Sequence, residues 1–550
     1  MKHYLLKLEE SVQRFWNEPA LCDYKGESFS FGEMATEMKR LEMFYDAIGV
    51  GAGAHVALCA KNTARWAVAF LSGAAHGCVM VPILADFHPE SVNRLVDHSD
   101  AVLLFADREI WARLDMALMP QLKGVVATDD FGLLYAADES VRLAYESCDE
   151  RLRAAFPLGY DSEYVRFKTD NMKELAVINY TSGTTSEPKG VMLLNEALSA
   201  SIDFGHRNIP VSAEDRIVSM LPMAHIYGMV YELLYPLSRG CTVYYLGKTP
   251  APSVLLAAMR EVKPFLVCTV PLVMEKVYRS AIHPKLHPWY MHLLRSLPVV
   301  KRVVNGKVRE ALDAAFGGRV RCYIMGGAAL SPQVERCFKE IGLHFTVGYG
   351  MTEAAPLLAY EDWRCFAAGS CGKPVDSADV RIDSDDPLRV VGEIQAKGKN
   401  ICVGYYKNEA ATAAAFTDDG YLRTGDLGVM DERGNLYIRG RSKNMILGAN
   451  GQNIYPEEVE AVVNSRRYVA ESLVVERGGR LTALVVLDKE RMVRDGLVLG
   501  SQVEDVVAEI KEGSNRHLPA YSRIASVEVR SEPFEKTPKM SIKRFLYMGE

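Results

Sequence analysis

The sequence predicts an α/β protein with a large N-terminal domain of layered, largely parallel sheets and a small α+β C-terminal lid domain. Three observations support this fold class. At 550 residues, the chain is too long for one ordinary domain. Strand-like and helix-like segments alternate over residues 28–107, which is typical of parallel α/β layers. The composition changes after Gly440, so we expect domains at residues 1–440 and 441–550.

The alternation is regular enough to place individual elements. We expect helices over residues 31–47, 66–76 and 90–96, and strands over residues 55–59, 79–81 and 101–105. Further strands are expected at residues 216–221, 242–246, 265–269 and 320–325. Residues 108–172 are charged and irregular and predict no clear element. The most apolar stretch, Trp66 to Leu84, contains His76 and two glycines, which favours a buried helix and strand over a membrane span.

The C-terminal region predicts its own small set of elements. Residues 456–458 should open a helix, because proline and acidic residues suit a first turn. Residues 473–475 and 481–487 flank a glycine pair and predict a hairpin. Ser501 is expected to cap a helix. Its apolar stripe consists of Val503, Val506, Val507 and Ile510.

The composition narrows the class of protein. Hydrophobic residues make up 49% of the chain and charged residues 24%, which is ordinary for a soluble globular protein. A net charge of −6 gives no general nucleic-acid footprint, so no nucleic-acid partner is expected. The eleven cysteines lack zinc-site spacing, which favours buried, reduced thiols and a cytoplasmic location. Glu9 and Glu10 come too early for a secretory signal; no transmembrane segment is expected, while peripheral membrane contact and oligomeric state are left open.

The stretch from Tyr180 to Gly190, Tyr-Thr-Ser-Gly-Thr-Thr-Ser-Glu-Pro-Lys-Gly, is the most informative part of the chain. It follows the apolar run Leu175–Ile178, which predicts a buried strand. Glycine lets backbone N–H groups approach an anion, and the hydroxyls and the lysine add donors, as a polyphosphate requires. The order is not Walker A, because no Gly-Lys-Ser/Thr follows the spacer. Taken alone, the loop is explained equally well as a plain turn.

This loop resembles the signature loop of the adenylate-forming enzymes, which include acyl-CoA synthetases, firefly luciferases and nonribosomal-peptide adenylation domains. Further blocks of that family follow in its order, from about residue 27 to the C-terminus. The blocks are Pro222–Gly228, Gly326–Leu330, Gly348–Glu353, Gly392–Ile394, Gly404–Tyr406, Tyr421–Asp426 and Gly440–Lys443. One block alone can arise by chance, but the ordered set identifies the chain as a member of this family.

The resemblance implies a site for ATP and a magnesium ion. Adenylation joins an anionic carboxylate to an anionic phosphate, so the site must neutralise charge and hold both partners in line. Magnesium keeps only one or two protein oxygen ligands, which by resemblance are Thr184 and Glu353. The implied nucleotide-binding residues are Thr181, Ser182, Gly183, Thr184, Thr185, Lys189, Gly326, Gly327, Ala328, Gly348, Tyr349, Gly350, Met351, Thr352, Asp426 and Arg441.

Several members of this set have a distinct expected role. Residues 326–327 follow an apolar strand, and a glycine pair there lets adenine lie against the backbone near Tyr349. The resemblance implies that Thr352 lies near the α-phosphate and that Asp426 and Arg441 contact the ribose. Taken alone, Thr184, Glu353 and the glycine pair are better explained as a turn hydroxyl, a surface carboxylate and a tight turn, and Asp426 is reasonably explained as a turn residue; the ordered set of blocks reverses that preference.

His225 lies among apolar residues, where a satisfied core histidine is the plain alternative. The resemblance implies a catalytic positioning residue beside the acyl carboxylate and ATP. A general-base role is not expected, because a carboxylate nucleophile is already ionised at neutral pH.

The C-terminal domain departs from the family pattern in one respect. Lys443 matches the family's hinge, which implies that the small domain rotates between the two half-reactions. The family expects a catalytic lysine near the C-terminus, but the run Thr537–Arg544 places Ser541 at its position. Lys539 and Lys543 would share a face with Ser541 on a strand, so either is a candidate substitute. The alternatives are that both are solvated or that they contact CoA phosphate or anionic lipid.

Together, these observations predict an AMP-forming acid–thiol ligase that adenylates a carboxylic acid and transfers the acyl group to coenzyme A. The blocks Pro222–Gly228 and Asn453–Pro456 most resemble those of the long-chain fatty acid ligases. Ligation to an acyl carrier protein and activation of another carboxylic acid are alternatives within the family. A non-catalytic homologue that binds nucleotide or an acyl group is the alternative from another class. The acyl chain length is not predicted.

Overall fold

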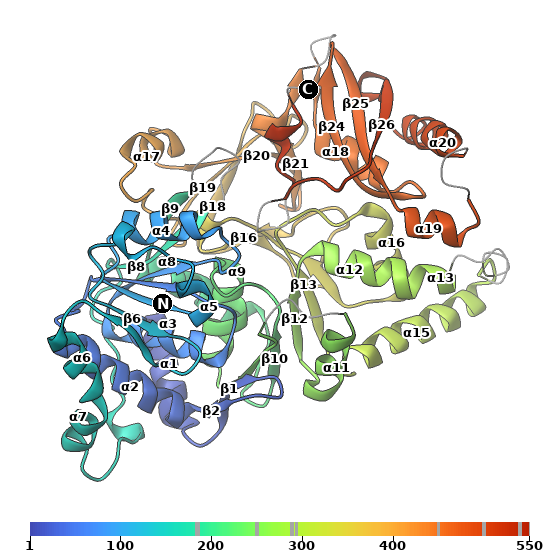
Figure 1. The fold of residues 1–550 in the computed structure, drawn as a ribbon. Coiled ribbons are helices and arrows are strands. Elements are labelled where there is room, and N and C mark those ends of the chain that lie inside the picture. Colours follow the sequence, from blue (N-terminus) through green and yellow to red (C-terminus); the bar gives the residue numbers. More distant parts are fainter. Residues whose placement is uncertain are drawn as a thin grey trace.

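The computed structural model describes residues 1–181, 188–247, 252–286, 291, 295–447, 452–497, 502–536 and 542–548. It confirms the predicted α/β class. Two seven-stranded sheets with helices packed around them make up the large N-terminal part, and a smaller α+β part follows at the C-terminal end (Figure 1).

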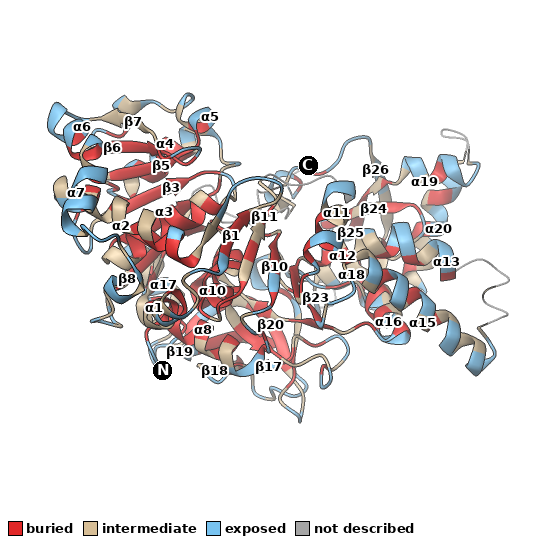
Figure 2. Cartoon of the chain, turned by 90° about the horizontal axis from the view of Figure 1, so that it is seen from below, coloured by how far each residue is buried: buried red, intermediate tan, exposed pale blue. Residues whose placement is uncertain are grey.

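The first sheet has the strand order β7-β6-β5-β3-β4-β8-β9. Its inner strands are parallel, whereas β7 and β9 pair antiparallel at the two edges. Both faces are covered, so β4 and β5 are buried along their whole length (Figure 2) and their sequences are continuous apolar runs. The strands are β3 (His55–Cys59), β4 (Val79–Ile83), β5 (Leu103–Ala106), β6 (Gly124–Ala127), β7 (Leu133–Ala136), β8 (Leu175–Thr181) and β9 (Lys189–Leu194).

The second sheet has the order β14-β13-β12-β10-β11-β1-β2 and is parallel except for the β1–β2 edge. Its parallel strands send all their carboxyl ends to one edge of the sheet, which is where ligands bind in open α/β sheets. The strands are β1 (Pro19–Asp23), β2 (Ser28–Ser30), β10 (Arg216–Ser219), β11 (Thr242–Tyr245), β12 (Leu266–Thr269), β13 (Cys322–Met325) and β14 (Phe345–Val347).

The long helices of the large part follow from local signals in the sequence. Ser30 and Glu33 form a reciprocal capping box at the start of α2, and Gly77 ends α3 in the left-handed conformation (φ 86°) that favours glycine. The helices of at least eight residues are α1 (Tyr4–Arg14), α2 (Phe31–Ala47), α3 (Ala64–His76), α4 (Pro89–His98), α6 (Glu139–Glu146), α7 (Cys148–Ala155), α8 (Asn195–Asn208), α11 (Pro252–Val262), α15 (Pro298–Ala315) and α16 (Pro332–Ile341).

Shorter helical elements fill the connections of the large part. They are α5 (Arg108–Trp111), η1 (Met116–Leu118), η2 (Ser162–Tyr164), α9 (Ile226–Gly228), η3 (Met229–Leu234), α10 (Tyr235–Leu237), α12 (Pro271–Val277), η4 (Tyr278–Ile282), α13 (His283–Leu286), η5 (Thr352–Ala354) and α17 (Glu409–Ala415).

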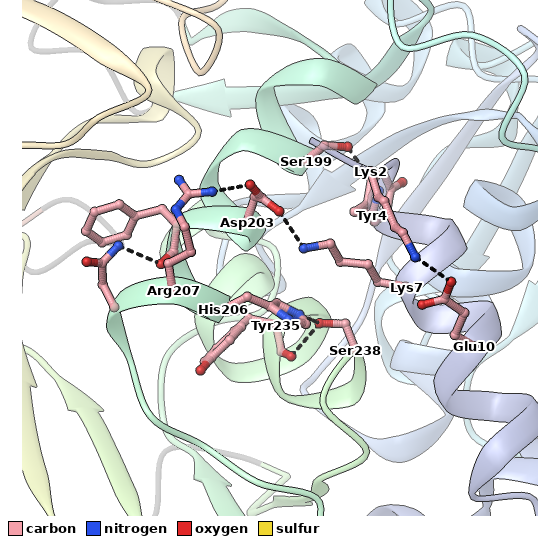
Figure 3. Close-up of polar contacts among 12 residues, drawn as sticks. Lys2, Tyr4, Lys7, Glu10, Ser199, Asp203, His206, Arg207, Tyr235 and Ser238 are labelled. Atoms are coloured by element: carbon pink, nitrogen blue, oxygen red, sulfur yellow. Dashed lines mark hydrogen bonds and ion pairs between the residues drawn. The ribbon is translucent and has the colours of Figure 1, made fainter.

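The N-terminal helix α1 is fastened to α8 by polar contacts (Figure 3). The backbone N–H of Tyr4 donates to the Ser199 hydroxyl at 3.0 Å. The Lys7 ammonium lies 2.6 Å from the Asp203 carboxylate, and both side chains are largely buried. These contacts join the first residues of the chain to a helix nearly two hundred residues away in the sequence.

Two smaller sheets connect the large part to the C-terminal part. Strands β15 (Tyr349–Gly350), β16 (Leu357–Tyr360) and β17 (Lys373–Pro374) form one sheet; the other consists of β18 (Ala378–Asp383), β19 (Gly392–Gly398), β20 (Leu422–Met430) and β21 (Leu436–Arg441). After η6 (Ser442–Asn444) the C-terminal part contains β22 (Ile446–Leu447), β23 (Asn453–Ile454), α18 (Pro456–Asn464), β24 (Val469–Arg477), β25 (Arg480–Leu487), α19 (Lys489–Arg494), α20 (Val503–Asn515), η7 (Ala520–Ser522), β26 (Ser526–Arg530) and η8 (Arg544–Leu546).

Two expectations from the sequence are corrected here. Residues 108–172 are not featureless, since they include β6 and β7 at the edge of the first sheet together with α6 and α7. The edge strand β7 and its neighbour β6 are short and lack a polar–apolar alternation, so their pattern was too weak to detect. Ser501 lies outside the described residues, and the residue at the N-cap of α20 is Gln502.

The stretch from Trp66 to Leu84 forms the buried helix α3 and strand β4, as predicted. Within the described ranges, no helix is both long and apolar enough to span a bilayer. Most of the cysteines are buried free thiols, while Cys365 is exposed.

Glu232 is a fully buried carboxylic acid that fixes the turn after β10. Its Oε2 accepts hydrogen bonds from the Ser219 hydroxyl (3.0 Å) and from the backbone N–H groups of Met220 (3.0 Å) and Leu221 (2.9 Å). No described residue pairs with Oε1. Burial raises the pKa of Glu232 from 4.5 to about 8.

This raised pKa predicts a pH-dependent contribution to stability. The folded protein binds the Glu232 proton more tightly than the unfolded chain does, so the stabilisation is complete below about pH 4.5 and is lost as the pH rises through about 8. Glu232→Gln keeps an acceptor and stays neutral, so its melting temperature should fall less than that of the parent between about pH 5 and about pH 9. Thermal unfolding of both proteins across this range tests the prediction; parallel profiles would contradict it.

Candidate active site

The second sheet brings two glycine blocks together at its carboxyl edge. Strands β13 and β14 are parallel neighbours, with Met325 opposite Val347, so Gly326 and Gly348 leave the sheet side by side. The backbone N–H of Gly348 donates to the Met325 carbonyl at 2.8 Å, which holds the two chain exits together. Residues 22 positions apart in the sequence thus form one backbone surface.

At the first of these exits the backbone requires small residues. A Cβ on Gly326 would lie 3.3 Å from the Tyr227 ring. Gly327 has a φ of 83°, a backbone conformation that residues with a side chain rarely adopt. Ala328, which follows, is exposed. This arrangement leaves an accessible backbone surface beside an aromatic ring, of a shape that a flat base could occupy.

Tyr349, Asp426 and Arg441 come together although they lie far apart in the sequence. The Tyr349 hydroxyl donates to Asp426 Oδ2 at 2.7 Å, and Arg441 Nε lies 3.0 Å from Asp426 Oδ1. Asp426 and Arg441 are also register partners across β20 and β21. Burial raises the pKa of Asp426, while the Arg441 guanidinium opposes that shift. Arg441 itself is 55% exposed, so it can still reach a ligand.

Glu353 is held at the end of the block that begins with Gly348. Its side chain is buried, and Oε1 accepts a hydrogen bond from the Tyr405 hydroxyl at 2.9 Å. Its backbone carbonyl accepts from the N–H of Cys402 at 2.8 Å. Gly350 makes this turn possible, because a Cβ there would lie 1.9 Å from the Pro356 carbonyl oxygen. Between them, Met351 is partly exposed and Thr352 is buried.

Residues 402–406 tie this turn to the hairpin that carries the phosphate-loop sequence. They run antiparallel to β9, with the N–H of Met192 donating to the Gly404 carbonyl (3.0 Å) and the N–H of Tyr406 donating to the Gly190 carbonyl (2.8 Å). The Lys189 ammonium lies 4.9 Å from the centre of the Tyr405 ring. Tyr405 therefore contacts both Glu353 and Lys189.

The tip of the β8–β9 hairpin is only partly described. Thr181 and Lys189 are the last register partners before the tip. The predicted phosphate-binding residues Ser182, Gly183, Thr184 and Thr185 lie outside the described residues.

His225 caps the short helix α9, because its Nδ1 accepts from the backbone N–H of Tyr227 at 3.2 Å. Two asparagines connect this segment to the first sheet. Asn179 on β8 donates to the Ala224 carbonyl at 2.8 Å, and Asn62, just after β3, donates to the Leu221 carbonyl at 2.7 Å. The carboxyl ends of both sheets therefore meet at residues 221–225.

The structure describes two of the three predicted hinge and C-terminal lysines. Lys443 is exposed on η6, and its neighbour Asn444 donates to Glu457 on α18 at 2.6 Å. The Lys543 ammonium lies 3.3 Å from Glu535, within the small domain. Lys539, like Ser541, falls outside the described residues.

Sequence reasoning missed Tyr405 and the two asparagines. The block Gly404–Tyr406 was recognised, but no role was assigned to its ring. Asn179 had a detectable signal, since it is a buried polar residue inside an otherwise apolar strand, where an unpaired amide is costly. Asn62 stands in a loop and gave no such signal.

Comparison with known proteins places most of the chain in a family. A family model for AMP-binding enzymes matches residues 8–406, and one for the C-terminal domain of AMP-binding enzymes matches residues 443–548. The long-chain-fatty-acid–CoA ligase FadD15 of Mycobacterium bovis is 28% identical, with 93% of this chain and 89% of the relative covered. The rat long-chain-fatty-acid–CoA ligase 5 is 26% identical, with 89% and 78% covered.

Solved structures share the fold at lower identity. ATP-bound MatB from Rhodopseudomonas palustris has a TM-score of 0.77 at 21% identity, covering 99% of this chain and 98% of that one. The o-succinylbenzoate CoA synthetase MenE from Bacillus subtilis, in complex with its acyl-adenylate, has a TM-score of 0.75 at 22% identity, covering 100% and 99%. Since the first family model matches well over half of the chain, the protein belongs to the AMP-binding, adenylate-forming family of enzymes.

Proposed function

We propose that this protein adenylates a long-chain fatty acid with ATP and magnesium and transfers the acyl group to coenzyme A, releasing pyrophosphate and AMP. The observation that carries the proposal is the convergence of Glu353, the Tyr349–Asp426–Arg441 cluster and the hairpin ending in Lys189. A cytoplasmic location is part of the same proposal.

The chain's own groups suit a nucleotide. Asp426 can accept hydrogen bonds from ribose hydroxyls, and Arg441 beside it favours the charged form of the buried carboxylate. The backbone at Gly326 and Gly327 can accommodate a base next to the Tyr227 ring. Lys189 adds positive charge where the phosphates would lie.

The oxygen donors near Glu353 suit magnesium. In the described part of the chain, only Oε1 of Glu353 accepts a side-chain hydrogen bond, so Oε2 remains to bind a cation. The described residues contain no cluster of three or more His, Cys, Asp or Glu side chains that could hold a metal ion. Thr184 is the proposed second ligand. When bound, magnesium supplies positive charge to the phosphates during the reaction.

The choice of acid rests on the relatives that match over most of the chain. Those quoted above are named for long-chain fatty acids. The structural neighbours include an anthranilate CoA ligase and an o-succinylbenzoate CoA synthetase. A medium-length or aromatic acid and a carrier-protein acceptor are therefore included in the tests.

Pyrophosphate release from ATP, magnesium and a panel of carboxylic acids, with and without CoA, tests the proposed function. We expect release with long-chain fatty acids, and acyl-CoA and AMP as products when CoA is present. Mass spectrometry identifies both products. Formation of ADP and phosphate would contradict adenylation, and transfer only to a carrier protein would contradict the CoA acceptor.

Glu353→Gln keeps the side-chain shape and removes the charge proposed to hold magnesium. Loss of one such electrostatic contact should slow adenylation about a hundredfold. Circular dichroism should show an intact fold. Adenylation rates equal to those of the parent across a magnesium titration would exclude Glu353 as a ligand.

Tyr405→Phe removes the hydroxyl that orients Glu353 but keeps the ring beside Lys189. Half-maximal adenylation should then require more magnesium, and the rate at low magnesium should fall about tenfold, because a hydrogen bond to a charged group is lost. Calorimetry of ATP binding with and without magnesium gives a readout that does not depend on turnover. Tyr406→Phe is the matched control, since its hydroxyl binds Asp100 instead (2.7 Å).

The C-terminal lysines are tested by separate alanine variants. If Lys539 or Lys543 replaces the family's lysine, the adenylation rate of its alanine variant should fall about a hundredfold. The variant should still form thioester from supplied acyl-AMP. Full activity in both variants would exclude substitution by either lysine. An inactive parent that gains adenylation on Ser541→Lys would instead support the non-catalytic homologue.

A further inference from the structure

One side of the large domain carries a charge opposite to that of the whole chain. The helical run formed by α12, η4 and α13 and the following helix α15 extend toward the right-hand edge of the view, on the side of the large part opposite α6 and α7 (Figure 1). Residues 271–315, from the start of α12 to the end of α15, contain eight Lys or Arg residues and three acidic residues, Glu275, Glu310 and Asp313, in a chain of net charge −6. Glu275 Oε1 accepts a hydrogen bond from the backbone N–H of Ser331 at 2.9 Å, so this carboxylate is used inside the fold.

The first half of α15 exposes aliphatic side chains next to these cations. Val299 is 77% exposed and Val303 53%, and Leu297, immediately before the helix, is 58% exposed. Val299, Val303 and Lys307 follow one another at intervals of four residues, and Arg302 is adjacent, so they share one face of the helix. We name Leu297, Val299, Arg302, Val303 and Lys307 the α15 outer face.

The cations of this face are available to a partner. Arg295 and Lys301 lie near the carboxylate of Glu340 (2.8 and 3.6 Å). In contrast, Arg302 and Lys307 form no ion pair with any carboxylate in the described part of the chain, and both are exposed. The opposite side of α15 is buried through Asn305, Val308 and Leu312, so the helix is anchored and its outer face is fixed.

We propose that the α15 outer face docks on a membrane surface that carries anionic lipid. Exposed aliphatic side chains can enter the boundary between headgroups and acyl chains, and Lys and Arg next to them are attracted to anionic headgroups. The long stems of Arg302 and Lys307 let their charges stay at the headgroup level while the valines are buried. An acidic protein or a nucleic acid would satisfy the charges but leave Val299 and Val303 without an apolar partner.

A second exposed aliphatic region shows why charge decides which exposed region can dock on an anionic membrane. Leu143 is 56% exposed and Leu158 98% exposed, near α6 and α7. Residues 139–164 contain six acidic residues and three Arg, so an anionic membrane would repel this region. The chain thus provides its own control, with exposed leucines in a setting of the opposite charge.

The inference gives the proposed function a source of substrate, since long-chain acids partition into bilayers; that link rests on the proposed function. Membrane docking itself does not, because it concerns a surface that contains none of the proposed nucleotide-binding residues. The two can therefore fail independently.

Co-sedimentation of the full chain with phosphatidylcholine vesicles, with and without phosphatidylglycerol, tests the docking in the absence of ATP, acid and CoA. We expect binding only to the anionic vesicles, and weaker binding as the salt concentration rises. Arg302→Glu with Lys307→Glu should weaken binding at least about tenfold. Val299→Ser with Val303→Ser should weaken it at constant charge.

Matched controls change the same residue types near α6 and α7. Arg151→Glu with Arg153→Glu, and Leu143→Ser with Leu158→Ser, should bind vesicles as the parent does. The proposal is overturned if the parent does not bind anionic vesicles, if the α15 variants bind as tightly as the parent, or if the protein binds only heparin or an acidic polypeptide. Pyrophosphate release with a water-soluble acid, unchanged in the α15 variants, then separates docking from catalysis.

Discussion

The parallel register of the second sheet is the constraint on which the site depends. Because β13 and β14 run side by side in the same direction, Gly326 and Gly348 must emerge next to each other. The chain then needs only a short turn, made possible by Gly350, to present Glu353. The backbone pairing of the two strands brings these groups together, and the buried side chains of β13 and β14 hold the sheet in the core. What side chains add is the connection to the first sheet, through Asn179 and Asn62.

The second essential connection is the segment of residues 402–406. This segment pairs with β9 by backbone hydrogen bonds and so extends the first sheet. It therefore follows any movement of the hairpin formed by β8 and β9. It is also bonded to Glu353 twice, through the backbone of Cys402 and the hydroxyl of Tyr405. The phosphate-loop hairpin and the Glu353 turn belong to different sheets. Residues 402–406 therefore set the distance between the β8–β9 hairpin and the Glu353 turn. This bridging role is the simplest physical reason for a glycine and an aromatic residue to occur together at 404–406.

The sequence predicted the buried elements well and the long-range contacts poorly. Strand β4 and helix α3 were predicted because continuous burial leaves an uninterrupted apolar run. The edge strand β7 and its neighbour β6 were missed, since short strands between charged segments give no periodic signal. The approach of Tyr349 to Asp426 depends on the folding of two separate sheets, so spacing alone could not show it; only the resemblance placed both at a nucleotide. The same limit applies to the side chain that Tyr405 meets.

The candidate site contains acidic as well as basic side chains, although its expected ligands are anionic. The site would bind a polyphosphate and a carboxylate, yet two of its own buried groups, Asp426 and Glu353, are acidic. The Arg441 guanidinium lies 3.0 Å from the Asp426 carboxylate, and the two charges balance each other. Arg441 therefore has little net positive charge to offer the phosphates. Lys543 is paired with Glu535 inside the small domain in this structure. Among the described groups, Lys189 is then the main positive charge near the hairpin tip, and its contact with the Tyr405 ring keeps it oriented without neutralising it. If magnesium binds beside Glu353 as proposed, the serine at position 541, where the family has a lysine, would make that ion and the Tyr405 hydroxyl that orients Glu353 more important here than in a protein with the complete family pattern.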